Sequence, residues 1–338
     1  MIDLLVIGGG PAGLATSLCA ARAGLEAVVV ERRPGTLDKA CGEGLMPHSL
    51  AQLDRLGVTA PGRTLRGISY HAGATRVEAP FRDGVGRGVR RTTLHAAMSD
   101  AARAAGVKVV QAAAAEITQD ADGVRAAGMR ARYLAAADGL HSAIRRDLGL
   151  ARPADGPRRW GIRRHIQMTP WTDNVEVHWS REAEAYVTPV ADDCVGIAIL
   201  SAGRGGFDSK FAVFDELRQR VEGHEFGPDL AAGPLRQQVR ARVAGRVLLV
   251  GDAAGYVDAL TGEGLGLAFS AAEALVDCVV RDRVDEYDRR WRNLTRRYRL
   301  LTEALVRAGS VPVVRSRIVP AAAALPWVFA GAVNQLAR

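Results

Sequence analysis

The chain has 338 residues, of which 48% are hydrophobic and 24% charged, as in a folded globular protein rather than a disordered one. This length suits one or two cores, such as one domain with a second inserted into it. The formal net charge is +8, but the basic residues are nearly all arginines spread along the chain, which argues against a nucleic-acid-binding protein and suits small anionic ligands.

The cysteines and the first residues indicate a cytoplasmic protein without a bound metal. The four cysteines lie far apart and form no CxxC pair, so the sequence predicts neither a zinc site nor disulfides. The first residues lack the basic region and cleavage site of a signal peptide and are better explained as a buried strand. The apolar stretch at residues 319–333 is shorter than the roughly 20 residues of a membrane span. We expect a helical lid over the substrate pocket there, with peripheral membrane contact as the alternative.

Three segments, near the beginning, middle and end of the chain, each combine a β-rich apolar run, a glycine turn and a helical pattern. Although separated in sequence, they are expected to assemble into one doubly wound α/β domain. In chain order, the predicted elements are strands at residues 4–7 and 27–30 separated by a helix to about residue 23, a helix at 92–105 with strands at 107–111 and 133–137, and a strand at 246–250 before a helix at 265–280.

A different pattern lies between the second and third segments. Residues 153–239 alternate apolar and polar side chains, which predicts an antiparallel sheet with one face in water. Inserted into the first domain, this sheet would form a wall of a ligand cavity. The predicted domains are therefore a discontinuous α/β domain at residues 1–65, 88–152 and 240–280, a substrate-binding sheet domain at 66–87 and 153–239, and a C-terminal helical segment at 281–338.

A glycine-rich turn follows the first predicted strand and opens the first helix. It has the GxGxxG pattern in the strand-turn-helix context that gives the pattern meaning, and its residues are Gly8, Gly10, Pro11, Ala12 and Gly13. Glycine permits the tight turn and lets backbone N–H groups approach a pyrophosphate at the helix N-terminus. Glu31, which ends the second strand beside Arg32, can accept hydrogen bonds from an adenosine ribose. The turn predicts a dinucleotide, either NAD or FAD.

A second motif, near the end of the chain, bears on the choice between these two cofactors. The strand at residues 246–250 leads into Gly251 and Asp252, and a loop follows that contains Gly262, Glu263, Gly264 and Leu265. These residues resemble the second FAD fingerprint of the para-hydroxybenzoate hydroxylase family. The resemblance implies an FAD-binding Rossmann-like domain with an inserted antiparallel sheet and C-terminal helices. It further implies that Asp252 binds the flavin ribityl chain and that the loop N–H groups face the flavin pyrimidine, where a helix N-terminus stabilises negative charge.

The middle segment agrees with this family. The stretch that begins at Asp138 and Gly139 and ends at Arg145 resembles its DGxxSxxR segment. Arg91, at the start of the predicted helix at residues 92–105, resembles an arginine that contacts the cofactor. Three separate parts of the chain therefore share one resemblance.

Residues 41–45 distinguish a branch within this superfamily. The segment is similar to the CGxGL segment of the geranylgeranyl reductases, and its glycines would let the backbone run close to the flavin ring; its residues are Cys41, Gly42, Glu43, Gly44 and Leu45. For Cys41, a packed thiol is favoured over a covalent or redox role, because no neighbouring cysteine could resolve it. FAD is therefore expected to be bound non-covalently.

One departure from the reductases bears on the substrate. Geranylgeranyl reductases carry the aromatic signature Tyr-x-Trp-x-Phe-Pro in the sheet, whereas residues 186–189 here read Tyr-Val-Thr-Pro. The difference favours a compact, hydrophobic aromatic or polyketide-like substrate over a polyprenyl chain. Tyr186 is the candidate substrate contact, and the sequence identifies no catalytic acid or base.

The favoured function is an FAD-dependent monooxygenase that receives electrons from NAD(P)H. We expect the nicotinamide to bind transiently, because no second GxGxxG follows a strand; residues 84–88 have similar glycines but are predicted to form a loop. Two alternatives stay open. One is a geranylgeranyl-reductase-like C=C reductase of a lipid or isoprenoid, and the other is a lipid escort protein on the same scaffold that performs no catalysis.

Overall fold

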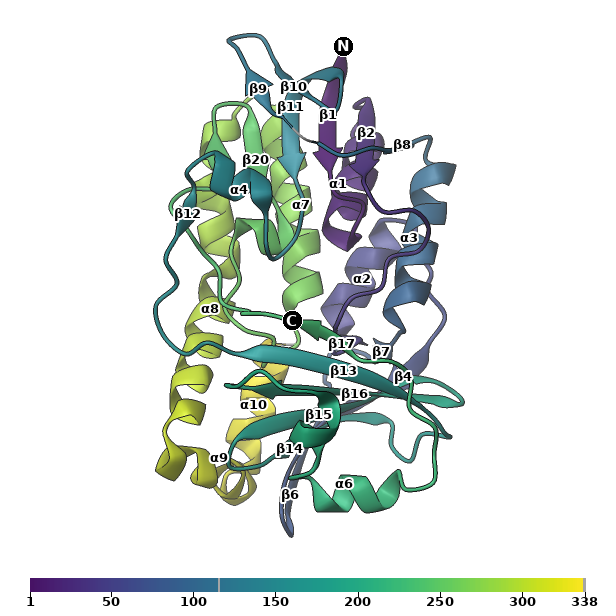
Figure 1. Ribbon diagram of the computed structural model, residues 1–338, viewed down its shortest axis with the longest axis vertical. Coiled ribbons are helices and arrows are strands. Elements are labelled where there is room, and N and C mark those ends of the chain that lie inside the picture. The colour runs from purple at the N-terminus through teal and green to yellow at the C-terminus, as the bar shows by residue number, and fades with distance from the viewer. Residues whose placement is uncertain (115, 337–338) are drawn as a thin grey trace.

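The computed structural model describes residues 1–114 and 116–336. Figure 1 shows two sheets along the long axis: the upper one holds the N-terminal strands β1 and β2, and the lower one holds β13 to β16. Helix α8 (Tyr287–Ser310) runs along one side of the molecule and packs on both α7 and α9. The cofactor residues predicted from the sequence lie around the junction of the two parts.

The upper sheet has the strand order β19-β20-β11-β1-β2-β8. Its core strands are parallel to their neighbours: β20 (Val247–Leu249), β11 (Met129–Ala136), β1 (Ile2–Ile7), β2 (Ala27–Glu31) and β8 (Lys108–Gln111). Short antiparallel strands extend this sheet: β9 (Thr118–Gln119), β10 (Val124–Ala126) and β19 (Val243–Ala244). Parallel strands covered on both faces need continuous apolar runs, and Leu4, Leu5 and Val6 are fully buried.

Three main helices accompany this sheet: α1 (Pro11–Arg22), α3 (Arg91–Ala104) and α7 (Gly264–Val280). Helix α1 begins with Gly10 as N-cap and Pro11 as its first residue, where a missing N–H costs nothing. It ends before Gly24, which has φ 76° and stops the helix in the left-handed conformation. The doubly wound α/β domain predicted from the sequence is confirmed.

The lower sheet has seven strands in the order β17-β13-β16-β15-β14-β5-β6. They are β17 (Leu230–Ala232), β13 (Trp160–Gln167), β16 (Cys194–Ser201), β15 (Ala183–Ala191), β14 (Asn174–Trp179), β5 (Gly67–Ala72) and β6 (Thr75–Pro80). All neighbours are antiparallel except β14 and β5. The inserted antiparallel sheet is therefore confirmed, with one parallel pair that the sequence pattern does not show.

The expectation that one face of this sheet is in water is wrong for its central strands. All but the last residue of β15 are buried. Helices α5 (Phe207–Phe211) and α6 (Asp215–Arg220) cover one face with Phe207, Phe211 and Leu217. The C-terminal helices cover the other face with Val319 and Phe329. Both faces therefore belong to hydrophobic cores.

Residues 86–88, predicted as part of a loop, form strand β7 (Gly86–Gly88) instead. It pairs with β3 (Gly44–Leu45) and β4 (Arg63–Leu65) in a three-stranded sheet. A Cβ atom on Gly88 would collide with the Pro189 carbonyl oxygen on β15, so these glycines serve close backbone packing rather than a ligand turn. The domain boundary predicted after residue 87 falls inside this strand.

The chain ends in α9 (Pro312–Ala324) and α10 (Pro326–Leu336), which contact β5 and β6. No single described helix is long and apolar enough to cross a membrane; α9 and α10 meet that criterion only together, with a bend of 103° between them. The remaining elements are α2 (Pro47–Arg55), α4 (Ala143–Asp147), β12 (Ala151–Arg152), β18 (Gln238–Val239), η1 (Gly251–Ala254) and η2 (Val284–Glu286).

Candidate cofactor site

The glycine turn between β1 and α1 is shaped by close backbone contacts. A Cβ atom on Gly13 would collide with the Gly8 carbonyl oxygen, and one on Gly8, which has φ 110°, would collide with the Ala137 carbonyl oxygen. A Cβ atom on Gly10, by contrast, would meet no atom within 4 Å. Open space therefore lies at the N-terminus of α1, where N–H groups without intrahelical partners favour an anion.

The Glu31 carboxylate faces this turn from the end of β2. Its Oε2 accepts a hydrogen bond from the Gly9 N–H at 2.8 Å, and its Oε1 accepts one from the Arg33 N–H at 3.0 Å. Burial would raise the pKa of Glu31, but these hydrogen bonds and the Arg33 side chain outweigh burial and hold the pKa below its ordinary value. The carboxylate is therefore an ionised acceptor at neutral pH. Arg32, the next residue, is exposed.

The second predicted motif lies beside the first, at the η1 turn after β20. Gly251 has φ 63°, and a Cβ atom there would lie 2.6 Å from the Cβ of Ala12. Asp252 follows, and its Oδ2 lies 2.7 Å from the Lys39 Nζ in an ion pair. Burial would raise the pKa of Asp252, but the Lys39 charge and two nearby arginines keep it below its ordinary value. The fold thus brings an ionised carboxylate next to the glycine turn.

Arg145 connects the predicted Asp138 loop to this turn. Its guanidinium donates hydrogen bonds to the carbonyl oxygens of Leu140 at 2.9 Å and Ala253 at 3.1 Å. Asp138 Oδ2 accepts a hydrogen bond from the Ile144 N–H at 3.2 Å. Its Oδ1 is buried and has no hydrogen-bond partner among the residues that the structure describes. A buried acceptor of this kind costs free energy unless a ligand donates to it.

The loop at residues 41–45 is anchored by Glu43. This residue is 3% exposed and has φ 60°, which is uncommon for a residue with a side chain. Its Oε1 accepts a hydrogen bond from the Arg91 N–H at 2.7 Å, and its Oε2 lies 2.6 Å from the His165 Nε2. The Arg91 Nε is buried without a partner in the described chain. Glu43 thus joins this loop to the start of α3 and to the lower sheet.

Strand β15 is hydrogen-bonded to two glycine loops, which are the loop at residues 41–45 and the loop that runs from Leu260 to Gly264. The Thr188 hydroxyl donates a hydrogen bond to the Gly42 carbonyl oxygen, and the Tyr186 hydroxyl donates one to the Leu260 carbonyl oxygen, both at 2.8 Å. Tyr186 is 9% exposed, and its hydroxyl is satisfied within the protein. Direct contact between Tyr186 and a substrate therefore stays a prediction.

Helix α7 begins at Gly264, after Gly262 with φ 72° and the buried Glu263. Glu263 Oε2 lies 3.2 Å from the His48 Nε2, and burial raises the pKa of Glu263 well above its ordinary value. The first N–H groups of α7 have no intrahelical partners, so the predicted loop ends at the positive end of a long helix. Leu265 is partly buried in the first turn of α7.

These features fit an FAD. The open space at Gly10 suits a pyrophosphate, and the ionised Glu31 and Asp252 suit hydroxyl groups. The buried Nε of Arg91 and Oδ1 of Asp138 have no hydrogen-bond partner among the residues that the structure describes. Individual contacts between the cofactor and the predicted residues stay a prediction; this applies equally to Pro11, Ala12, Gly139, Gly42, Gly44, Leu45, Gly262, Glu263, Gly264 and Leu265.

Sequence reasoning missed Lys39 and His165. Lys39 pairs with Asp252 from 213 positions away, and His165 pairs with Glu43 across the two domains. No local pattern marks either residue, since the partners meet only in the folded chain. The φ of Glu43 is equally invisible in the sequence, although its place between two glycines could have suggested a tight turn.

Comparison with known proteins agrees with this geometry. A family model described as an FAD binding domain matches residues 1–279. Menaquinone reductase of Mycolicibacterium smegmatis is 26% identical over 328 residues, covering 86% of this chain and 80% of the relative. Rifampicin monooxygenase of Streptomyces venezuelae is 26% identical over 301 residues, covering 80% of this chain and 62% of the relative. The crystal structure of halogenase PltM in complex with phloroglucinol and FAD superposes with a TM-score of 0.77 at 16% identity, covering 99% of this chain and 85% of PltM.

The fold and the site together define an FAD-dependent flavoprotein. The chain belongs to the FAD-binding family whose model covers its first 279 residues, a family of FAD-dependent oxidoreductases.

Cys41 supplies a first prediction. Its Sγ accepts a hydrogen bond from the Glu43 N–H at 3.4 Å, and all four cysteines are free. We therefore expect Cys41→Ala to retain its FAD and most of its activity, and acid precipitation of the wild-type protein to release all of its flavin. Flavin remaining in the precipitated protein would show a covalent bond and contradict the packing role.

Proposed function

We propose that the protein is an NAD(P)H-dependent FAD monooxygenase that acts on a compact, hydrophobic aromatic or polyketide-like molecule. The observation that carries the proposal is the position of β15. This strand bonds to both glycine loops through Thr188 and Tyr186, and its stretch at residues 186–189 lacks the bulky aromatic pair of the geranylgeranyl reductases. A wall without that aromatic pair is expected to hold a polyprenyl chain less well than a compact substrate.

When bound, FAD would supply the redox chemistry between NAD(P)H and O₂, by which one oxygen atom enters the substrate and the other leaves as water. The chain's own residues hold the cofactor and keep water out. Asp252 and Glu31 would bind its hydroxyl groups, and the N-terminus of α1 its pyrophosphate. The buried β15 would exclude water from the reacting end, which limits wasteful side reactions.

A flavin-dependent C=C reductase is the second candidate function. It is supported by the likeness to menaquinone reductase over most of both chains and by the Cys41–Leu45 segment. In that reaction the same cofactor would pass hydride to the substrate, and O₂ would take no part.

The two functions are separated by the fate of oxygen. For a monooxygenase, NAD(P)H oxidation in the presence of substrate should consume O₂, and reaction under ¹⁸O₂ should place one ¹⁸O atom in the product. Turnover at a comparable rate without O₂, giving a product with two additional hydrogens, would exclude the monooxygenase and establish the reductase. Candidate substrates should include both resorcinol-like aromatics and isoprenoid quinones.

We also propose that the protein binds peripherally to anionic membranes through α9 and α10. Val313 and Trp327 on these helices are 74% and 73% exposed, and Val311, Val314, Leu325 and Val328 are exposed around them. From residue 304 to the end, the sequence contains no acidic residue. Arg317 on α9 is exposed, whereas Arg307 and Arg315 are paired with Glu303 and Glu184. Exposed apolar side chains, including a tryptophan, next to positive charge suit the headgroup region of an anionic bilayer.

The membrane proposal predicts that the double variant Val313→Ser/Trp327→Ser sediments less with phosphatidylglycerol vesicles than the wild type. Val280→Ser is the matched control, because Val280 is 50% exposed on a different helix. Equal sedimentation of all three proteins, or no sedimentation of the wild type, would contradict the proposal.

A further inference from the structure

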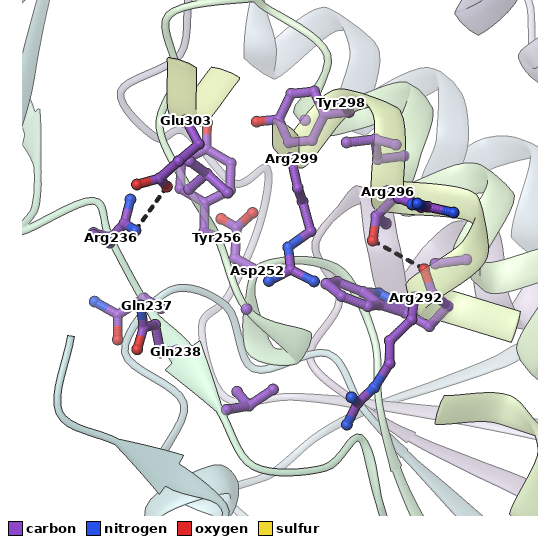
Figure 2. A pocket seen from close by; sticks show the side chains of 18 of the residues that line it. Arg236, Gln237, Gln238, Asp252, Tyr256, Arg292, Arg296, Tyr298, Arg299 and Glu303 are labelled. Atoms are coloured by element: carbon purple, nitrogen blue, oxygen red, sulfur yellow. Dashed lines mark hydrogen bonds and ion pairs between the residues drawn. The ribbon is translucent and has the colours of Figure 1, made fainter. Parts of the chain in front are cut away.

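A cavity of about 740 Å³ lies between α7, α8 and the segment around β18, beside the η1 turn. Asp252 and Gly264 line it, whereas Gly10, Glu31 and Arg91 do not. Figure 2 shows Arg236 and Arg299 on opposite sides of the cavity, with Tyr256 and Asp252 between them. The cavity therefore shares Gly251, Asp252 and Gly264 with the candidate FAD site, whereas none of the other predicted cofactor residues lines it.

The lining is strongly basic. Residues 292, 296, 299, 303 and 307 recur at intervals of three or four and share one face of α8. The other wall contributes Arg152, Arg236 and Arg242. The lining includes seven arginines but only three acidic residues, which are Asp155, Asp252 and Glu303.

These acids do not neutralise the arginines. Asp252 is engaged by Lys39, which lies outside the cavity lining. Glu303 is shared between Arg236 at 2.7 Å and Arg307 at 2.9 Å. Asp155 lies 3.6 Å from Arg236 with a side chain that is 81% exposed, so solvent screens that pair.

Asp288 does not line the cavity, and it forms ion pairs with both Arg242 and Arg292. In the described part of the chain, Arg152, Arg296 and Arg299 have no side-chain ion pair or hydrogen bond; all three are exposed, and the Arg299 guanidinium lies 5.6 Å from the centroid of the Trp291 ring.

Two of the arginines also bear an electrostatic cost. The Arg236 side chain is only 10% exposed, and its Nε and Nη1 are buried without a hydrogen-bond partner among the described residues. Arg299 is exposed, but partial desolvation of its guanidinium lowers its pKa, and the positive charges of Arg292 and Arg236 lower it further. Leaving buried donors unpaired is unfavourable, and an anion that accepts hydrogen bonds from them would remove the cost.

We propose that this cavity binds a ligand with two or more phosphate-type anions, of the nucleotide or diphosphate class. The guanidinium fork matches phosphate oxygens, and the opposed arginine walls suit more than one anionic group. Two sources share this chemistry: the pyrophosphate of a nicotinamide dinucleotide, and the headgroup of a phosphorylated lipid, which only the second candidate function, the C=C reductase, would use as its substrate. That the ligand sits beside the flavin rests on the proposed function, whereas the anion site itself does not.

The test uses the FAD-loaded protein, in which we expect the flavin's own pyrophosphate to occupy the glycine turn, and inorganic pyrophosphate as the calorimetric probe. We expect saturable binding to one site. The double variant Arg296→Gln/Arg299→Gln should weaken it at least about tenfold, the effect of losing charge-assisted hydrogen bonds. Arg297→Gln is the matched control, since Arg297 is exposed on α8 but does not line the cavity.

Absence of pyrophosphate binding to the wild type, or equal weakening by Arg297→Gln, would overturn the proposal. The source is identified by the KM for NADPH: a rise in the double variant but not in the control indicates the dinucleotide, and an unchanged KM indicates a phosphorylated substrate. Flavin content separates the two proposals, because an FAD-loaded protein that does not bind pyrophosphate refutes only the anion site.

Discussion

Gly10→Val is expected to abolish tight FAD binding while leaving the protein folded. A Cβ atom at this position meets no protein atom within 4 Å, so the valine side chain would enter only the space at the N-terminus of α1. There it would block the approach of the pyrophosphate to the backbone N–H groups. Losing two charge-assisted hydrogen bonds, each worth about 1.5 to 3 kcal/mol, would weaken binding more than about a hundredfold. Flavin content after purification and the circular dichroism spectrum are the measurements.

Two other glycines provide controls for this variant. Gly203→Val should keep full flavin content, because Gly203 also has open space around it but lies in a distant loop. Gly13→Ala should lower stability as well as flavin content, because its Cβ atom collides with the backbone of Gly8. If Gly10→Val purified with the wild-type amount of FAD, the glycine turn could not be the pyrophosphate site.

Glu184→Gln is expected to destabilise the protein by about 3 to 5 kcal/mol, the usual effect of removing one partner from a buried ion pair. The Glu184 side chain is 1% exposed and pairs with Arg159 and, at 2.6 Å, with Arg315 on α9. Arg159 also lies 3.5 Å from Asp258. Among the described residues, the variant would leave the buried Arg315 without an ion pair and Arg159 with Asp258 alone, which would loosen the C-terminal helices from the sheet.

Urea unfolding measures this effect. The matched control is Glu182→Gln, two positions earlier on the exposed surface, where we expect a change of no more than about 0.5 kcal/mol. Equal free energies of unfolding for both variants would contradict the role of Glu184 as the buried anion between α9 and the sheet.

The sequence predicted the upper domain well because its signals are local. A strand, a glycine turn and a helix follow one another at Gly8 to Gly13, and the Gly251-Asp252 turn follows a strand in the same way. The packing against Ala12 then brings these two motifs together. Strands buried on both faces also leave a continuous apolar run that is easy to recognise.

The remaining features depend on contacts between distant segments. The water-exposed face predicted for the lower sheet is absent from β15, because α5, α6 and the C-terminal helices cover both of its sides. The alternation of apolar and polar residues along one strand does not show which helices pack against it. The ion pairs of Lys39 with Asp252 and of Glu43 with His165 likewise join residues more than a hundred positions apart. The arginine cavity arises from α8 meeting the segment around β18, whereas in the sequence its arginines look like ordinary surface charge.

The most direct test of the central claim is the flavin content and redox behaviour of the purified protein. We predict one FAD per chain, released by acid, whose absorbance is bleached by NADH or NADPH under anaerobic conditions with substrate present and returns when O₂ is admitted. A protein that purifies without flavin and cannot be reconstituted with FAD would contradict the account and would favour a non-catalytic lipid escort on the same fold.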